Sequence, residues 1–325
     1  MSAYGRIHPQ TVALVVNPQA GHGVSQEAAR LATQELTRLG IDVVSLQGSS
    51  ATESQRLVRE AVADDRVDAV AVAGGDGMVN LALQELAHQN KPLGIIPAGT
   101  GNDHGREYQL PRHSPVEAAR IIAQGHCRRT DLGLITDQAG QQHWFGTIMC
   151  AGFDSIVSDR VNAMTWPHGR NRYNLAIVVE FLKFHSLPFH LRFEGVHDSS
   201  EAVELADDGS LELDLPITLA AFGNTRSYGG GMKICPEADH ADGLLDVTVI
   251  GKATRWQAAT TFQKVFSGTH TEHPSVSTYR VQKAHVACLS ERTMNAYADG
   301  DFMAALPVTV EVSPGAGCYL VPEPV

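Results

Sequence analysis

The sequence has few of the features that mark secreted, membrane-spanning or redox-active proteins. Its five cysteines are widely spaced and form no C-x-x-C pair, which disfavours a zinc ribbon or redox motif and favours a reducing, cytoplasmic setting. No apolar run approaches the roughly 20 residues that a transmembrane helix needs, and the N-terminal residues lack an apolar core of signal-peptide length. We therefore expect no transmembrane segment, and the sequence leaves open a peripheral position on the inner face of the membrane.

An excess of positive charge is also lacking. The formal net charge is -11, and no basic stripe is present that could collect the phosphates of a nucleic acid or anchor the chain to an acidic membrane. Hydrophobic residues make up 43% of the chain and charged residues 19%, as in an ordinary folded protein. Its 325 residues are enough for two domains, each with its own core. The oligomeric state stays open, a homodimer included.

Residues 1–130 show the alternation of buried strands and amphipathic helices that is typical of a doubly wound α/β domain with a mostly parallel sheet. Ser114, Pro115 and Glu117 have the spacing of an N-cap, a first-turn proline and a capping-box partner. Thr52 and Gln55 show capping-box spacing ahead of an earlier helix. Strands are predicted at 11–18, 41–46, 67–73 and 92–98, and helices at 25–39, 52–62, 78–89 and 114–125.

Residues 131–306 change to short segments with period-2 alternation, separated by Gly, Asp, Asn and Pro turns, which predicts an all-β domain. Two helical segments, 170–186 and 254–268, interrupt it. The first contains the apolar stretch 173–184, which is either part of the core or the lining of a slot for an apolar substrate. Strands are predicted at 129–136, 142–150, 188–195, 211–224, 244–250, 285–291 and 307–312.

Three glycine-rich turns follow predicted strands of the first domain, at 17–23, 74–80 and 97–103. The carboxyl ends of parallel strands share one edge of the sheet, so these turns can line one pocket. Glycine lets backbone N–H groups approach phosphate oxygens, and a helix N-terminus adds open donors. Asp76 would repel bare phosphates, which suggests a bridging Mg²⁺ and hence a metal-nucleotide. The alternative is that the turns are only tight connections.

None of these turns has the spacing of a P-loop or of the G-x-G-x-x-G dinucleotide fingerprint. The motifs "NPQAG", "GGDGMVN" and "PAGTGND" occur in that order, followed by "NTRSYGGGMKICPEADHADGLLDV" at 224–247 and "YADGDF" at 297–302. In these motifs the chain resembles the diacylglycerol kinase and sphingosine kinase family, and in particular its soluble bacterial lipid kinases. The resemblance spans nearly the whole chain.

The resemblance implies an N-terminal α/β ATP-binding domain, to which the segment 307–325 returns, and a C-terminal β-sandwich domain. It implies Mg²⁺ and ATP as cofactor and cosubstrate, and transfer of the γ-phosphoryl group to a lipid hydroxyl at a membrane surface, most simply that of diacylglycerol. Asp301 takes the place of the family's general base, and Asp76 that of the aspartate that orders Mg²⁺. A structural Mg²⁺ is implied at Asp239, Asp242 and the carbonyl of Leu244. The implied nucleotide contacts are Asn17, Pro18, Gln19, Ala20, Gly21, Gly74, Gly75, Asp76, Gly77, Met78, Val79, Asn80 and Thr100.

The chain departs from the family pattern at three positions. Asp301 replaces the usual glutamate and is one methylene shorter, although it can still act as a base. Met78 stands where a threonine is usual, and His22 where a lysine is frequent. Two alternatives therefore stay open: a kinase for NAD or another non-lipid acceptor that shares the G-G-D-G loop, and a non-catalytic nucleotide or lipid sensor.

Three further residues, Asn102, Asp103 and Arg106, follow the third glycine turn. Their polar side chains either position that turn or contact the acceptor, and the guanidinium of Arg106 could offset negative charge that develops during phosphoryl transfer. The sequence does not choose between these roles.

Overall fold

The computed structural model describes residues 4–17, 23–153, 155–157, 160, 186–200, 203–252, 263–291 and 293–323. The chain divides into two compact units: unit 1 comprises residues 1–132 and 314–325, and unit 2 comprises residues 133–313. Both points at which the chain passes from one unit to the other lie within strands, β6 (His126–Thr136) and β18 (Val308–Leu320).

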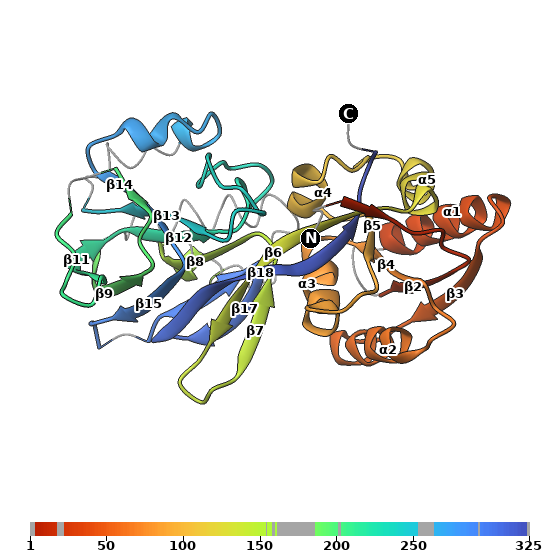
Figure 1. Ribbon diagram of the computed structural model, residues 1–325, viewed down its shortest axis with the longest axis horizontal. Helices are drawn as coiled ribbons and strands as arrows, with labels where there is room; N and C mark the ends of the chain where they lie inside the picture. The colour runs from red at the N-terminus through yellow and green to blue at the C-terminus, as the bar shows by residue number, and fades with distance from the viewer. Residues whose placement is uncertain are drawn as a thin grey trace. The chain divides into compact units, whose positions relative to one another are not determined.

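Unit 1 alternates strands and helices along most of its length (Figure 1). Besides parts of β6 and β18, its elements are β1 (Tyr4–Arg6), β2 (Thr11–Val16), α1 (Val24–Arg38), β3 (Asp42–Gln47), α2 (Ala51–Ala63), β4 (Ala69–Gly74), α3 (Asp76–Leu86), β5 (Leu93–Pro97), α4 (Asp103–Glu107) and α5 (Pro115–Gln124).

The sheet of unit 1 is mostly parallel, with the parallel strand order β3-β2-β4-β5-β18, while β6 pairs with β18 and β1 pairs antiparallel with β6. Every residue of β4 and β5 is buried, as expected of central strands covered on both faces. Helices α1 and α5 pack together on one face, and α2 and α3 pack together on the other (Figure 1). This arrangement confirms the predicted doubly wound α/β domain.

Two helix starts test the capping predictions. Ser114 is the N-cap of α5, with its side chain accepting from the N–H of Glu117 and Pro115 in the first turn, as predicted. The prediction for α2 is wrong: Ser50, not Thr52, is the N-cap and accepts from the N–H of Glu53 at 3.1 Å. The Glu53 carboxylate also accepts from the N–H of Ser49 at 2.7 Å, and this second bond favours the earlier start.

Unit 2 consists mainly of antiparallel strands. Besides parts of β6 and β18, its described elements are β7 (Gln142–Phe145), β8 (Ile148–Gly152), β9 (Leu187–Glu194), β10 (Asp198–Ser199), β11 (Leu211–Ile217), β12 (Leu219–Gly223), β13 (Leu245–Ile250), the 3-10 helix η2 (Thr269–Glu272), β14 (Val276–Val281), β15 (Lys283–Cys288), β16 (Asn295–Ala298) and β17 (Asp301–Ala305).

One sheet of unit 2 has the order β10-β14-β13-β12-β8-β16-β17, and the other contains the run β11-β9-β15-β18. The hydrophobic core of the unit draws side chains from both, with Phe189 and Phe193 of β9 in one cluster with Phe222 of β12, Val247 of β13 and Tyr279 of β14. Two sheets that share one core form a sandwich, which confirms the predicted C-terminal fold.

Two segments predicted as single strands are each two strands. The segment 142–150 breaks after Phe145 into β7 and β8, and 211–224 breaks at Thr218 into β11 and β12, which belong to different sheets. Thr218 turns the chain by donating its N–H to the carbonyl of Ile250 and its hydroxyl to that of Gly251. A strand that changes sheets keeps its alternation, so the sequence pattern does not reveal the break.

The predicted helix 170–186 lies almost wholly outside the described residues, as do the apolar stretch 173–184 and the first part of the predicted helix 254–268. Among the helices that are described, none is both long and apolar enough to span a membrane.

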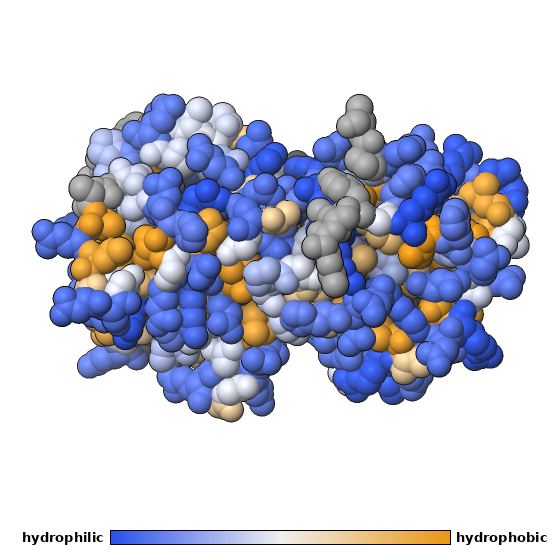
Figure 2. Space-filling model, in the orientation of Figure 1, coloured by the Kyte–Doolittle hydropathy of each residue, from blue (hydrophilic) through white to orange (hydrophobic). Residues whose placement is uncertain are grey.

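Hydrophilic residues cover most of the face of each unit that Figure 2 shows. Large hydrophobic side chains are exposed at well-separated positions of the described chain: Val24, Leu39, Val44, Leu205, Phe266, Leu289 and Phe302. Single exposures of this kind are common on folded proteins. Phe302 is the exception of interest, because it directly follows Asp301, the predicted base.

Candidate active site

The second and third glycine turns of unit 1 lie against each other. Strand β4 ends at Gly74 and α3 begins at Asp76, while β5 ends at Pro97 and the third turn follows. A Cβ atom on Gly99 would lie 2.4 Å from the Cα atom of Gly75, closer than real Cβ contacts occur. A Cβ atom on Gly75 would lie 3.1 Å from the Cα atom of Gly99, a tight contact. The two turns therefore meet backbone to backbone, and glycine is needed above all at position 99.

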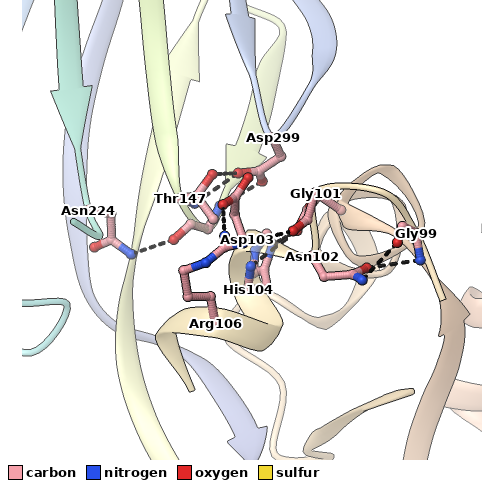
Figure 3. A network of polar contacts seen from close by, with 11 residues as sticks. Gly99, Gly101, Asn102, Asp103, His104, Arg106, Thr147, Asn224 and Asp299 are labelled. Carbon is pink, nitrogen blue, oxygen red and sulfur yellow. Dashed lines mark hydrogen bonds and ion pairs between the residues drawn. The ribbon is translucent and has the colours of Figure 1, made fainter. Parts of the chain in front are cut away.

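The third turn is held in shape by its own polar groups. Asn102, with φ 51°, accepts from the N–H of Gly99 at 2.9 Å and donates to the carbonyl of Gly99 at 2.8 Å (Figure 3). Arg106 donates to the carboxylate of Asp103 and, at 3.3 Å, to the carbonyl of Gly101. Asn102, Asp103 and Arg106 thus position the turn, and Thr100 is exposed on it.

Asp76 is the carboxylate of this site and its side chain is only 16% exposed. Its Oδ1 atom accepts from the backbone N–H of His104 at 3.1 Å and lies 3.2 Å from Nδ1 of the same residue. Burial opposes its charge, but the contacts with His104 and the backbone N–H of Asp103 outweigh burial and hold the pKa of Asp76 below its ordinary value. Asp76 is therefore an ionised carboxylate at neutral pH.

His104 is a site residue that the sequence analysis missed. It is buried, and its ring centroid lies 6.3 Å from that of Tyr319, which stacks on Tyr108 at 4.3 Å. Its two contacts with Asp76 fix the direction of that carboxylate. No spacing rule connects residues 76 and 104, and the only available signal was that both follow neighbouring parallel strands.

At the start of α3, some backbone N–H groups are already bonded within the helix and others are available for a phosphate. The N–H groups of Met78 and Val79 both donate to the carbonyl of Gly75, at 3.0 and 3.3 Å. Helix geometry leaves the first-turn N–H groups, those of Asp76 and Gly77, without an acceptor inside the helix. The side chains of Met78, Val79 and Asn80 are buried, so Met78 replaces threonine at a position that packs inward.

The first glycine turn is described only at its ends. Asn17 follows β2 and is half-buried. His22 and the other predicted nucleotide contacts of this turn lie outside the described residues. These contacts are Pro18, Gln19, Ala20 and Gly21.

In unit 2, the motif "YADGDF" forms a tight β-hairpin between β16 and β17. Asp299 and Gly300 occupy its two turn positions with φ 53° and 89°, as a two-residue turn that matches strand twist requires. The buried carboxylate of Asp299 accepts from the N–H groups of Gly146 and Thr147, each at 2.8 Å, and from the Thr147 hydroxyl (Figure 3). Asp299 thus anchors the hairpin, while Asp301 begins β17 with its side chain exposed.

The acidic turn 239–246 of unit 2 contains the predicted structural metal ligands. Asp239 accepts from the N–H of Ala241 at 3.1 Å, and Asp242 Oδ1 accepts from the N–H of Leu244 at 3.0 Å. Asp242 Oδ2 accepts from Arg280 of β14. Within the described ranges, no group of three or more His, Cys, Asp or Glu side chains could hold a metal ion. Because Arg280 already pairs with Asp242, a divalent cation on this carboxylate would meet a positive charge, and in this respect Asp242 fits a bound metal poorly.

Comparisons with known proteins agree on one class. Residues 11–135 match the family described as "Diacylglycerol kinase catalytic domain", and residues 147–318 match "YegS C-terminal NAD kinase beta sandwich-like domain". A solved structure of a diacylglycerol kinase from Bacillus anthracis str. Sterne shares the fold, with a TM-score of 0.68, 20% identity and coverage of 96% of this chain and 97% of that one. The molecule is thus a kinase built from an α/β domain and a β-sandwich domain.

Curated relatives carry the assignment further. A "Diacylglycerol kinase" of Mycobacterium tuberculosis (strain CDC 1551 / Oshkosh) is 46% identical over 312 residues, covering 96% of this chain and 95% of the relative. A "Probable lipid kinase YegS-like" of Stenotrophomonas maltophilia (strain K279a) is 30% identical over 283 residues, covering 83% and 85%. The chain belongs to the diacylglycerol kinase family and is a lipid kinase, a phosphotransferase with an alcohol as acceptor. The family implies ATP as the cosubstrate.

Proposed function

We propose that the protein transfers the γ-phosphoryl group of Mg-ATP to the free hydroxyl of diacylglycerol and so produces phosphatidic acid. The observation that carries this proposal is the pair of apposed glycine turns that present an ionised Asp76 at the start of α3. The Mycobacterium tuberculosis relative, similar over nearly its whole length, supports the choice of acceptor.

The triphosphate is assigned to the edge of the sheet where β4 and β5 end. The open N–H groups of Asp76 and Gly77 are donors for phosphate oxygens, and the positive end of the α3 dipole favours negative charge there. Gly75 and Gly99 present backbone without a side chain, so a phosphate can approach closely. Thr100 and the residues of the first turn, Asn17 to Gly21, complete the proposed nucleotide contacts.

Asp76 fits the way in which proteins hold Mg²⁺ at a nucleotide. Mg²⁺ usually keeps several waters and takes one or two carboxylates together with substrate phosphates, rather than a full set of protein ligands. An ionised, oriented and partly accessible carboxylate beside a phosphate site meets this need. The ion, when bound, neutralises the charge of the phosphate oxygens, and His104 keeps the carboxylate pointed correctly.

Asp301 is assigned as the general base. Its carboxylate takes the proton of the lipid hydroxyl, the hydroxyl oxygen bonds to the γ-phosphorus, and the bond to the β,γ-bridging oxygen breaks to release ADP. Aspartate is shorter than the glutamate usual in the family, but the Asp299 anchor fixes the hairpin that carries it. The anchored hairpin holds the backbone that sets the position of the Asp301 carboxylate.

The hairpin that carries Asp301 also exposes an apolar ring. Phe302 is 54% exposed, and its ring meets Tyr297 edge-on with centroids 5.9 Å apart. Consecutive strand residues face opposite sides of a sheet, so the ring offers an apolar contact on the hairpin but does not share a face with the Asp301 carboxylate. Because diacylglycerol resides in the bilayer, we propose that the enzyme binds the membrane surface peripherally and transiently.

The proposal is tested by phosphate transfer from radiolabelled ATP to diacylglycerol, monoacylglycerol, ceramide, a sphingoid base and NAD, each in a separate assay with mixed micelles. We expect the strongest labelling of diacylglycerol, in a reaction that stops when Mg²⁺ is chelated. Labelling of NAD alone would overturn the lipid assignment. Labelling of ceramide or sphingoid base in preference to diacylglycerol would keep the reaction class and replace the acceptor.

A further inference from the structure

The acidic turn 239–246 of unit 2 meets a single guanidinium. Arg280 lies on β14 directly opposite Asp246 of β13, and Asp198 of β10 is opposite it on the other side. Its Nη2 atom donates to Asp242 Oδ2, and its Nε atom lies 3.6 Å from Asp246 Oδ2. One positive charge therefore bridges two carboxylates that would otherwise repel each other.

These carboxylates are poorly screened by solvent. The Asp246 side chain is 12% exposed and that of Asp242 24% exposed, so neither is fully hydrated. Like charges at partly buried positions destabilise a fold unless a counterion or a hydrogen bond compensates them. The negative charge of the turn therefore needs a positive partner, which is either a metal ion or a cationic side chain.

A metal ion is a poor candidate for this position. A divalent ion on Asp242 would have to displace the charge-assisted bond from Arg280 or lie next to its positive charge. Asp239 is more than half exposed and bonded to the N–H of Ala241, and it does not join Asp242 in a described cluster of metal-binding side chains. The Asp242 carboxylate thus already has a positively charged partner within the protein.

We propose that Arg280 is the built-in counterion of the turn 239–246 and that it takes the place of the structural metal ion suggested by the family resemblance. Unit 2 then folds and stays folded without a divalent cation. The inference concerns unit 2 alone and does not depend on which lipid is phosphorylated.

The test is thermal unfolding without nucleotide, so that no phosphate-bound metal contributes. The wild-type melting temperature should be the same in excess EDTA and in millimolar Mg²⁺ or Ca²⁺. Arg280→Met, which keeps an unbranched apolar stem but removes the charge, should lower the melting temperature by at least about 4 °C. Millimolar Mg²⁺ or Ca²⁺ should restore part of this loss, because the two vacated carboxylates become open to a cation.

Arg192→Met is a matched control from the same unit. The Arg192 side chain is 36% exposed, against 35% for Arg280, and it also meets several carboxylates, with Asp208 nearest at 2.7 Å. Those carboxylates are far more exposed, so we expect a smaller loss and no cation effect.

Two results would overturn the inference. One is a wild-type melting temperature that falls in EDTA and recovers with Mg²⁺, because the turn would then hold a metal. The other is an Arg280→Met protein as stable as the wild type. If Arg280→Met does not fold, the proposal is tested by Arg280→Lys and by the wild-type EDTA experiment. Arg280→Lys keeps the charge, so it should fold and its melting temperature should not respond to Mg²⁺. A melting temperature of this variant that depends on Mg²⁺ would contradict the proposal.

Discussion

Replacing Gly99 by alanine tests the apposition of the two glycine turns. The added Cβ would lie 2.4 Å from the Cα atom of Gly75 and 3.1 Å from its N atom, and ordinary contact begins at 3.4 Å. Both groups belong to backbone, so the turns themselves must move apart. Overpacking of this kind costs about 1–3 kcal/mol, which is about 2–4 °C in melting temperature for each kcal/mol in a domain of this size.

The larger effect should fall on catalysis. A displacement of about 1 Å at a phosphate-positioning loop can cost about 10²-fold in rate. We therefore expect kcat/KM for ATP to fall about 100-fold in Gly99→Ala, measured by radiolabelled transfer to diacylglycerol. Gly5→Ala is the control, since a Cβ there meets nothing within 4 Å and φ is not positive. Wild-type rate and stability in Gly99→Ala would refute the steric argument.

Three further variants test other parts of the account. His104→Phe keeps an aromatic ring but removes the Nδ1 contact with Asp76, so the apparent affinity for Mg-ATP should fall about 10-fold or more. His104→Asn should recover part of this affinity. An affinity equal to that of the wild type in the Phe variant would exclude a positioning role for His104. Asp301→Asn should reduce kcat by at least about 10² while ATP binding, followed by calorimetry, stays unchanged. The third is Glu35→Gln: Arg38 and then Arg120 lower the pKa of Glu35 to about 2, so the carboxylate stabilises the fold above pH 4.5 and loses this effect as the pH falls towards 2. Urea unfolding should show that Glu35→Gln has a lower free energy of unfolding than the wild type at pH 7 and that this difference narrows below pH 4.5. Glu27→Gln, which removes the carboxylate of the exposed Arg30–Glu27 pair, is the control. A difference independent of pH would contradict this assignment.

Much of the fold could be predicted because its signals are local. The parallel sheet follows from short buried runs between amphipathic helices, and Ser114 with Glu117 marks a helix start through neighbours in sequence. At Ser50 and Thr52 two overlapping capping patterns compete, and only the structure shows that Glu53 makes an additional bond to Ser49. The sheet change at Thr218 depends on distant pairing partners and leaves no local mark.

In the candidate site too, features carried by neighbouring residues could be predicted and contacts between distant residues could not. Asp76 and the glycine turns are visible in the sequence because a carboxylate among glycines at a strand end is unusual. The contact of His104 with Asp76, and the steric need for glycine at 99, depend on how two loops pack. The bridge from Arg280 to Asp242 joins residues 38 apart in sequence, so no motif within the turn could predict its counterion.

The central proposal is that Asp76 orients the Mg-ATP from which this lipid kinase phosphorylates diacylglycerol. The most direct measurement compares wild type and Asp76→Asn for transfer of radiolabelled phosphate from Mg-ATP to diacylglycerol, with thermal unfolding to verify that both are folded. We predict labelled phosphatidic acid from the wild type and a rate lower by at least about 10²–10³ from the variant, because the carboxylate that orients the metal-nucleotide is lost. A folded Asp76→Asn protein that labels diacylglycerol at the wild-type rate would contradict the account.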